Sequence, residues 1–194
     1  MATTGPPAPN TPGVTYLNVP AIRAELDGIK KGTSEGHVAG VWNAILSWMF
    51  PVTDGYVTRP QDIHRYFGGA KGFSDLHTFQ YDAAGRRRFF LIVQCKPYSS
   101  EGSTADWQEA ANQLRDYLSA IHKTRPAGRR TRVYGIAALG RRVRFFEYND
   151  LTRNANGWRP SGTWAVTHNG REFYDMRREA TEVQSALDFI LNNH

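Results

Sequence analysis

The apolar run Phe89-Phe90-Leu91-Ile92-Val93 constrains the fold of this chain more than any other feature. Because apolar residues occupy both alternating faces, a strand over 88–96 must be covered on both sides and lie centrally in a sheet. The strand ends in Gln94-Cys95-Lys96, and Pro97 then stops its pairing. Side chains alternate along a strand, so Gln94 and Lys96 share one face and Cys95 points to the other. A buried strand that ends in an amide and an ammonium indicates a functional site.

A lone acid, Asp75, lies on the preceding candidate strand over 73–81. The segment 82–85 (Asp-Ala-Ala-Gly) is typical of a hairpin turn between the two strands. Alternating residues of the first strand share one face, namely Phe73, Asp75, His77, Phe79 and Tyr81. In a hairpin, Asp75 is therefore expected to meet Gln94 and Lys96.

The remaining elements follow from the spacing of apolar residues and from chain breakers. We expect helices over 20–32, 34–50, 105–122 and 176–192, strands over 55–59, 132–139 and 143–148, and a helical turn over 61–67. Residues 150–172 have no clear pattern. This order predicts an α/β fold with a mixed central sheet flanked by helices.

The chain has 194 residues, enough for one well-filled core. We expect a flexible Pro-rich tail over 1–17 and a single domain over 18–194. With 24 basic and 18 acidic residues the net charge is +6, which favours a polyanionic partner such as nucleic acid. A basic protein with no such partner is the alternative that charge alone leaves open.

Composition also excludes several classes of protein. The single cysteine, Cys95, allows no disulfide within the chain. The first residues have neither the basic start nor the apolar segment of a signal peptide, and no apolar stretch approaches the ~20 residues that cross a bilayer. We therefore expect an intracellular protein, in the cytoplasm or nucleus, with no membrane partner.

The residues at the end of the buried strand suit phosphate chemistry better than other catalysis. Mg²⁺ prefers oxygen ligands, and Asp75 with the Gln94 amide can supply them. Lys96 can orient an attacking water or stabilise charge on a phosphate oxygen. A serine or cysteine hydrolase is disfavoured, because Cys95 points away from Lys96 and no serine lies in a nucleophile elbow. The chain has neither zinc-ligand spacing nor a phosphate-binding Gly-rich loop.

The order of Asp75 and Gln94-Cys95-Lys96 across a hairpin resembles the PD-(D/E)XK nuclease superfamily, in the Mrr-type variant where glutamine replaces the second acid. Gln113-Leu-Arg-Asp-Tyr117 is similar to the QxxxY motif of RecB-type nucleases in that superfamily. The resemblance covers about residues 34–148 and implies a restriction endonuclease-like αβββαβ core. The sequence departs from the superfamily pattern at Ser74, which stands where the motif has proline, and at Gln94, which removes a charge.

The resemblance also implies roles for individual residues. It implies a metal-dependent nuclease that hydrolyses phosphodiester bonds, with DNA favoured over RNA, and that uses Mg²⁺ or Mn²⁺. The implied metal ligands are the side chains of Asp75 and Glu35 and the backbone carbonyl of Cys95. The Gln94 amide would add a further ligand or orient water. Lys96 would position the nucleophile, and Gln113 and Tyr117 would orient Lys96 or a substrate phosphate. A homodimer is compatible with this class of enzyme.

Alternatives remain open for several of these residues. Glu25 competes with Glu35 for the position of the helical glutamate, and Glu35 is favoured in a first helical turn for electrostatic reasons alone. His77 either touches substrate or metal or is a half-buried strand histidine. Gln113 and Tyr117 alternatively form a solvated helix flank. Because of Gln94, a catalytically inactive protein of the same fold, which binds nucleic acid or a protein, is the main alternative function, and a purely structural or interaction protein is the second.

Runs of arginine form the candidate nucleic-acid contacts. They flank the ends of strands and comprise Arg86, Arg87 and Arg88, then Arg129, Arg130 and Arg132, and then Arg141, Arg142 and Arg144. In these positions they can contact phosphates without reading sequence. They can equally be edge charges that prevent the sheet from pairing with other chains.

Overall fold

A computed structural model describes the backbone of residues 5, 7–65, 71–124, 132–148, 158–160 and 173–194. The helices are α1 (Pro20–Asp27), α2 (Glu35–Met49), α3 (Thr104–Thr124) and α4 (Ala180–Asn193), with short 3-10 turns at Tyr16–Asn18, Val52–Asp54 and Tyr98–Ser100. The strands are β1 (Tyr56–Arg65), β2 (Lys71–Tyr81), β3 (Arg87–Lys96), β4 (Val133–Leu139), β5 (Arg142–Tyr148), β6 (Trp158–Pro160) and β7 (Tyr174–Asp175). None of the described helices is long and apolar enough to cross a membrane.

The described strands form one mixed sheet in the order β1-β2-β3-β4-β5-β6, with β7 beside β5. Neighbouring strands are antiparallel except for β3 and β4, which are parallel. Helix α3 makes the crossover between these two parallel strands, as such a connection requires. The elements α2, β1, β2, β3, α3 and β4 follow one another in the predicted αβββαβ order, so this prediction is confirmed.

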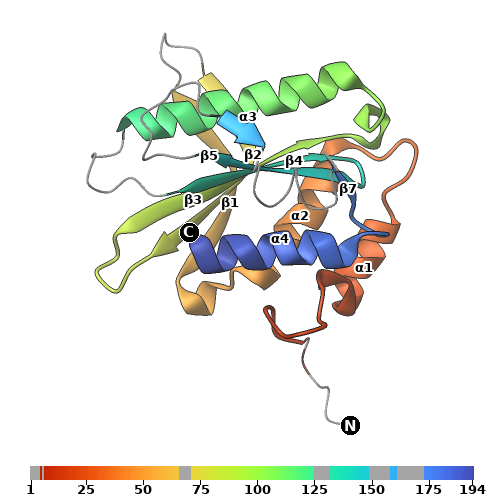
Figure 1. Cartoon of the computed structure of the whole chain (residues 1–194), viewed down its shortest axis with the longest axis horizontal. Coiled ribbons are helices and arrows are strands. Elements are labelled where there is room, and N and C mark those ends of the chain that lie inside the picture. The colour runs from red at the N-terminus through yellow and green to blue at the C-terminus, as the bar shows by residue number, and fades with distance from the viewer. Residues whose placement is uncertain (1–4, 6, 66–70, 125–131, 149–157, 161–172) are drawn as a thin grey trace.

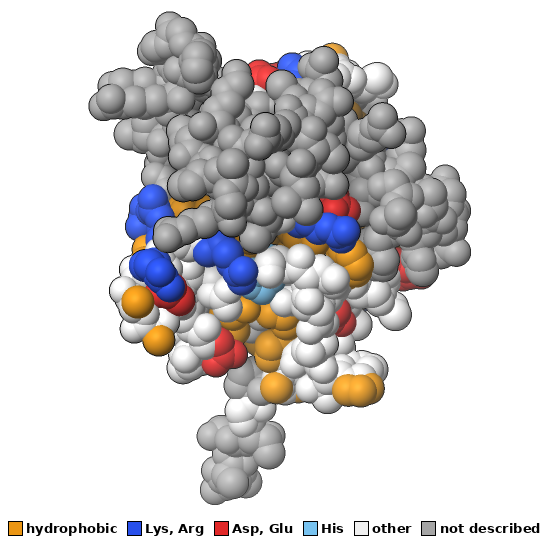
Figure 2. Space-filling view, turned by 60° about the vertical axis from the view of Figure 1, so that its left-hand side comes forward, with side chains coloured by type: hydrophobic (Ala, Val, Ile, Leu, Met, Phe, Trp, Pro, Cys, Tyr) orange, Lys and Arg blue, Asp and Glu red, His pale blue; other side chains and the backbone are white. Residues whose placement is uncertain are grey.

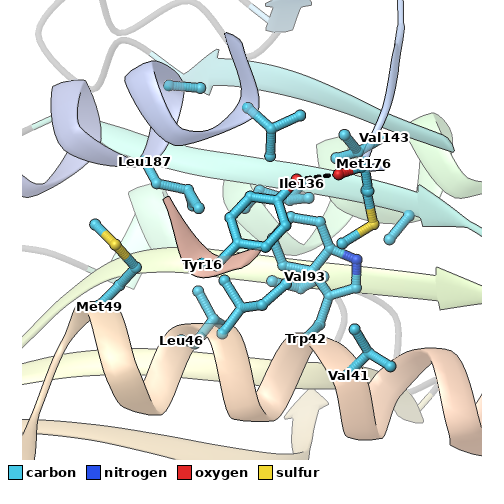
Figure 3. Close-up of a cluster of buried hydrophobic side chains, with 14 of the residues drawn as sticks. Tyr16, Val41, Trp42, Leu46, Met49, Val93, Ile136, Val143, Met176 and Leu187 are labelled. Carbon is cyan, nitrogen blue, oxygen red and sulfur yellow. Dashed lines mark hydrogen bonds between the residues drawn. The ribbon is translucent and has the colours of Figure 1, made fainter. Parts of the chain in front are cut away.

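The sheet separates two apolar clusters (Figure 1). On one face, α1, α2 and α4 pack on alternate residues of β3 such as Val93 and Cys95. Figure 3 shows this cluster around Trp42 and Tyr16. The Tyr16 hydroxyl donates a hydrogen bond to the Met176 carbonyl at 2.5 Å. On the other face, α3 packs on Ile92 and its neighbours. The prediction that β3 is central and covered on both sides is confirmed.

A β-bulge in β3 adjusts the two faces of the hairpin. Thr78 pairs with Leu91, but Phe79 pairs with Phe89, so Phe90 is the extra residue. Phe90 and Leu91 consequently both belong to the cluster under α2 and α4. The bulge therefore places two consecutive apolar side chains on the same face of β3.

The predicted helical turn over 61–67 is wrong for its described part. Strand β1 continues from Tyr56 to Arg65 without interruption and pairs with β2 as far as Lys71. Pro60 is tolerated inside it because β1 is at the edge of the sheet and needs no second partner. Residues 66 and 67 lie outside the described residues.

Two helix ends also differ from the predictions. The first helix ends at Asp27 rather than at Gly32, and Thr33 Oγ1 accepts a hydrogen bond from Lys30 N in the loop that follows. The last helix begins at Ala180 rather than at about 176. Before it, the Asp175 carboxylate accepts hydrogen bonds from two successive backbone N–H groups and so forms a turn.

Two described residues of the segment before α1, Pro7 and Tyr16, contact the rest of the molecule. Tyr16 lies within the predicted flexible stretch 1–17, yet it is fully buried. The Pro7 carbonyl accepts a hydrogen bond from Trp48 Nε1 at 2.9 Å. Pro7 is thus attached to α2, whereas Tyr16 is hydrogen-bonded to Met176 and to Gln184 on α4.

Candidate functional site

Asp75 and Gln94 meet where β2 and β3 separate. The backbone pairing of the two strands reaches Leu76 and Val93, and from Leu91 onward β3 also pairs with β4. Asp75 Oδ2 accepts hydrogen bonds from Gln94 Nε2 at 2.8 Å and from the Cys95 backbone N at 2.5 Å. The side chain of Asp75 thus bridges the two strands just beyond their last backbone pair.

The environment of Asp75 disfavours its charge. The pKa of this carboxyl is raised from 3.8 to about 6, chiefly because burial removes water from the charged form. The Cys95 N–H bond opposes this effect, the negative charge of Glu35 adds to it, and the positive charge of Lys96 opposes it. A buried acid beside a second acid and a lysine is a typical feature of functional sites.

Glu35 approaches this site from the start of α2. Ser34 caps the helix by accepting from His37 N, and Glu35 is therefore fixed as its first residue. Tyr98 N donates to the Thr33 carbonyl at 3.3 Å, which ties this helix start to the segment after β3. The charge of Glu35 raises the pKa of the Asp75 carboxyl and of the buried Cys95 thiol.

The competing glutamate, Glu25, has a different environment. It is exposed on α1, and its carboxylate lies 3.5 Å from His37 Nε2. Its charge is not among the causes that shift the pKa of Asp75. Of the two candidates, Glu35 is therefore the one whose charge acts on Asp75.

Lys96 contacts a residue that the sequence analysis missed. Its Nζ lies 3.1 Å from Glu109 Oε1 on α3, and the Lys96 side chain is only 16% exposed. Glu109 is four residues before Gln113, so the helical period puts both on one flank. That spacing was the available signal, but the sequence does not specify how far α3 is rotated about its axis over β3.

Gln113 and Tyr117 have distinct surroundings on α3. Gln113 Nε2 donates to Glu109 Oε1 at 3.0 Å, while Gln113 Oε1 is buried and has no hydrogen-bond partner in the described part of the chain. Tyr117 is 2% exposed and belongs to the apolar cluster with Leu114. The alternative of a fully solvated flank is therefore wrong for this pair.

His77 is buried on the Asp75 side of β2. Its ring packs 5.6 Å from the Phe79 ring and 5.2 Å from the Phe89 ring, measured between centroids. Only 1% of the residue is exposed. This agrees with a packed strand histidine rather than with a residue that touches substrate.

The oxygen atoms of Asp75 and Gln94 are of the type that a hard cation such as Mg²⁺ prefers. Gln94 Oε1 is buried and, within the described residues, accepts no hydrogen bond. Such an amide oxygen is a free acceptor in the side chain that contacts the Asp75 carboxylate. Across the described ranges, no three His, Cys, Asp or Glu side chains are grouped so as to hold a metal ion, so an ion here would also need neutral oxygens.

The arginines of the β2–β3 hairpin differ in their contacts. Arg86 pairs with Asp82 at 2.7 Å and is largely exposed. Arg87 lies over the Phe79 ring at 4.5 Å, and Arg88 donates to Gln80 Oε1. Figure 2, turned to bring this side of the molecule forward, shows Lys and Arg side chains gathered in a row. An exposed basic surface is therefore present at this end of the sheet.

Arg141 and Arg142 lie outside the β2–β3 hairpin, at the start of β5. Arg141 donates from its guanidinium to the Ile29 carbonyl and from its backbone N to Glu101 Oε1, so it fixes the loop after α1. Arg142 lies over the Phe173 ring at 4.9 Å. Arg129 and Arg130 lie outside the described residues.

No family model matches the chain, and no curated protein matches it. Among solved structures, the chain is similar to one described as "cryoEM structure DrdV-DNA complex", with 17% sequence identity and a TM-score of 0.48. The likeness covers 89% of this chain and 13% of that chain, so this chain spans a small part of the other protein. A likeness of this degree carries no argument about function.

Proposed function

We propose that the chain is a Mg²⁺-dependent nuclease of the PD-(D/E)XK type that cleaves DNA in preference to RNA. The contact between Asp75 and Gln94 across the end of the β2–β3 hairpin is the observation that carries this proposal. Glu35 and Lys96 support it, because both act electrostatically on the same carboxylate. The αβββαβ order of the elements also supports the proposal, because it is the order that the resemblance implies.

In the proposed reaction, the oxygen of water attacks phosphorus, one ester P–O bond breaks, and the leaving oxygen takes up a proton. Asp75, Glu35, the Gln94 amide oxygen and the Cys95 carbonyl are the proposed ligands of Mg²⁺. When bound, this ion polarises the phosphate and lowers the pKa of water. The Lys96 ammonium orients the water or stabilises negative charge on a phosphate oxygen.

Nucleic acid is the proposed partner because the chain is basic and exposed arginines gather at the hairpin end. Arg86 and Arg87 are exposed on the hairpin, where they can contact phosphates of a duplex. Such contacts give affinity without reading the base sequence.

Incubation of the purified protein with supercoiled plasmid, single-stranded DNA and RNA tests the proposal. We expect cleavage of DNA that requires Mg²⁺ or Mn²⁺ and is lost in Asp75→Ala and in Lys96→Ala. Gln108→Ala, at an exposed position on α3, is the matched control and should cleave at the wild-type rate. Cleavage that persists in both site variants would refute the site assignment.

A catalytically inactive protein that binds nucleic acid is the second candidate function. The observation in its favour is that Gln94 replaces an acid and that its amide N–H₂ is already used by Asp75. In that case we expect the protein to bind DNA but not to cut it, whichever metal ion is added. Binding measured by fluorescence anisotropy together with a cleavage assay separates the two functions.

A further inference from the structure

Glu109 connects the end of β3 with the glutamine of α3, and we propose that it is a positioning residue for Lys96. This inference rests on the proposed nuclease function and extends it to a residue outside the sequence motifs. One carboxylate oxygen, Glu109 Oε1, accepts hydrogen bonds from Lys96 Nζ at 3.1 Å and from Gln113 Nε2 at 3.0 Å. Glu109 thus joins Lys96 to Gln113, which the resemblance implies would orient Lys96 or a substrate phosphate.

The exposure of the three side chains indicates that Lys96 is the one whose position is fixed by the others. The Lys96 side chain is 16% exposed, whereas the Glu109 side chain is 56% exposed. Gln113 is partly buried, with its Oε1 shielded from solvent. The Gln113 amide therefore fixes the Glu109 carboxylate from the helix side, and the carboxylate in turn fixes the ammonium.

Fixing the ammonium matters because a lysine side chain is long and has many rotamers. Ordering it at the moment of reaction costs conformational entropy, and a contact already present in the free protein removes that cost from the reaction step. The Glu109 side chain is 56% exposed, so water can replace it as a partner of Lys96, and the ion pair contributes little to stability. With a purely structural role, Glu109 would therefore have almost no effect on activity.

Kinetics of the full chain on plasmid DNA with Mg²⁺ test the proposal. We expect Glu109→Ala to lower kcat about tenfold, which corresponds to about 1.4 kcal/mol, with KM unchanged. Glu109→Gln should lie between wild type and Glu109→Ala, because its amide oxygen still accepts from Lys96 without the charge. Gln108→Ala, on the same helix in an exposed pair with Asn112, is the matched control.

A second measurement reports on Lys96 without requiring cleavage. Acylation by a water-soluble succinimidyl ester, followed by peptide mass spectrometry, should label Lys96 several-fold faster in Glu109→Ala than in wild type. Unchanged labelling overturns the proposal whether or not the protein cuts DNA. Faster labelling with unchanged kcat, or a raised KM with unchanged kcat, also overturns it.

The two measurements separate this proposal from the proposed function. If wild type cuts no nucleic acid with any metal, the nuclease function fails. Faster labelling in Glu109→Ala then still supports Glu109 as the residue that holds Lys96. If wild type cuts in a manner that depends on Asp75 but Glu109→Ala matches it, only the present inference fails.

Discussion

Asp75 combines burial with a charge that its surroundings disfavour. Two donors, Gln94 Nε2 and Cys95 N, stabilise its charged form, yet burial and Glu35 still raise its pKa to about 6. Acids of this kind often reduce stability in exchange for function. We therefore expect the raised pKa of Asp75 to affect the pH dependence of folding stability as well as that of activity.

We predict that Asp75→Asn stabilises the protein above pH 6. The folded state holds the Asp75 proton more tightly than the unfolded chain, so stability is highest below pH 4, falls as pH rises from about 4 to 6, and is constant above. At pH 8 the raised pKa of Asp75 corresponds to a loss of about 3 kcal/mol in the free energy of unfolding. We expect Asp75→Asn to recover ~2 kcal/mol of this loss, because an asparagine oxygen accepts weaker hydrogen bonds than a carboxylate does. Urea unfolding at pH 8 and pH 4 measures the difference, which should vanish at pH 4.

Asp82→Asn is the matched control for this experiment. Hydrogen bonds from Arg86 and Ala84 hold the pKa of the exposed Asp82 carboxyl below its ordinary value. Its contribution has the opposite sign, because it is present at neutral pH and is lost on acidification. A loss of stability in Asp75→Asn at pH 8 would contradict the conclusion that the buried charge of Asp75 destabilises the folded protein.

Gln94→Glu tests whether the amide limits metal binding. A carboxylate at this position loses the bond from Nε2 to Asp75 Oδ2 and repels that oxygen, so we expect a lower melting temperature without metal. With Mg²⁺ the added charge becomes a ligand, and the rise in melting temperature should begin at a lower ion concentration than in wild type. Thermal unfolding over a Mg²⁺ titration, with Ca²⁺ as comparison, gives both quantities. An identical metal response of the two proteins would rule out Gln94 as a ligand.

At the scale of elements, the loop between β4 and β5 supports the end of β3. Gly140 N donates to the Lys96 carbonyl at 3.2 Å, and Gly140 has φ of +56°. A Cβ at this position would lie 2.8 Å from Glu101 Cγ, while Glu101 Oε1 is held by Arg141 N. Neither the backbone nor the neighbouring carboxylate can easily adapt to a side chain here.

We predict that Gly140→Ala destabilises the protein by about 3 kcal/mol, from a left-handed backbone and from the clash with Glu101. Gly85→Ala is the matched control, because φ there is +71° and nothing lies within 4 Å of an added Cβ. That variant should lose only ~1 kcal/mol. Chemical denaturation of the three proteins measures both losses, and equal losses would show that Glu101 moves away freely.

Much of this element arrangement was predictable because the patterns involved are local. The cap at Ser34, the apolar stripe of α2 and the apolar run of β3 each specify an element from neighbouring residues. The end of β1 was missed because pairing with β2, and not its own residues, extends it past Pro60. Tertiary pairing of this kind leaves no local signal.

In the candidate site too, the sequence predicts contacts set by local rules but not those set by tertiary packing. The meeting of Asp75 with Gln94 followed from strand alternation and a hairpin, both of which are short-range rules. The contact of Lys96 with Glu109 did not, because it depends on how α3 packs across β3 and β4. Side chains that meet only through helix packing are the ones that a sequence alone cannot pair.

At the scale of the whole molecule, the charge of +6 acts through its distribution over the surface. Asp75 and Gln94, the centre of the proposed metal site, lie toward one end of the paired part of β2 and β3, and the hairpin arginines lie at the other (Figure 1). A duplex bound along this side would contact both. Affinity for DNA should then depend on salt, because each phosphate contact releases counterions.

The salt dependence of binding gives the last prediction. For duplex DNA and the Asp75→Ala variant, which should bind without cutting, a plot of log affinity against log salt concentration should be linear. Arg87→Ala should make its slope shallower by about 0.9, the value for one lost phosphate contact. Arg115→Ala removes the same charge from α3, where Arg115 pairs with Asp116, and should leave the slope unchanged. Equal slopes in all three proteins would show that the hairpin does not contact DNA, whereas a parallel loss in both arginine variants would reduce the effect to net charge.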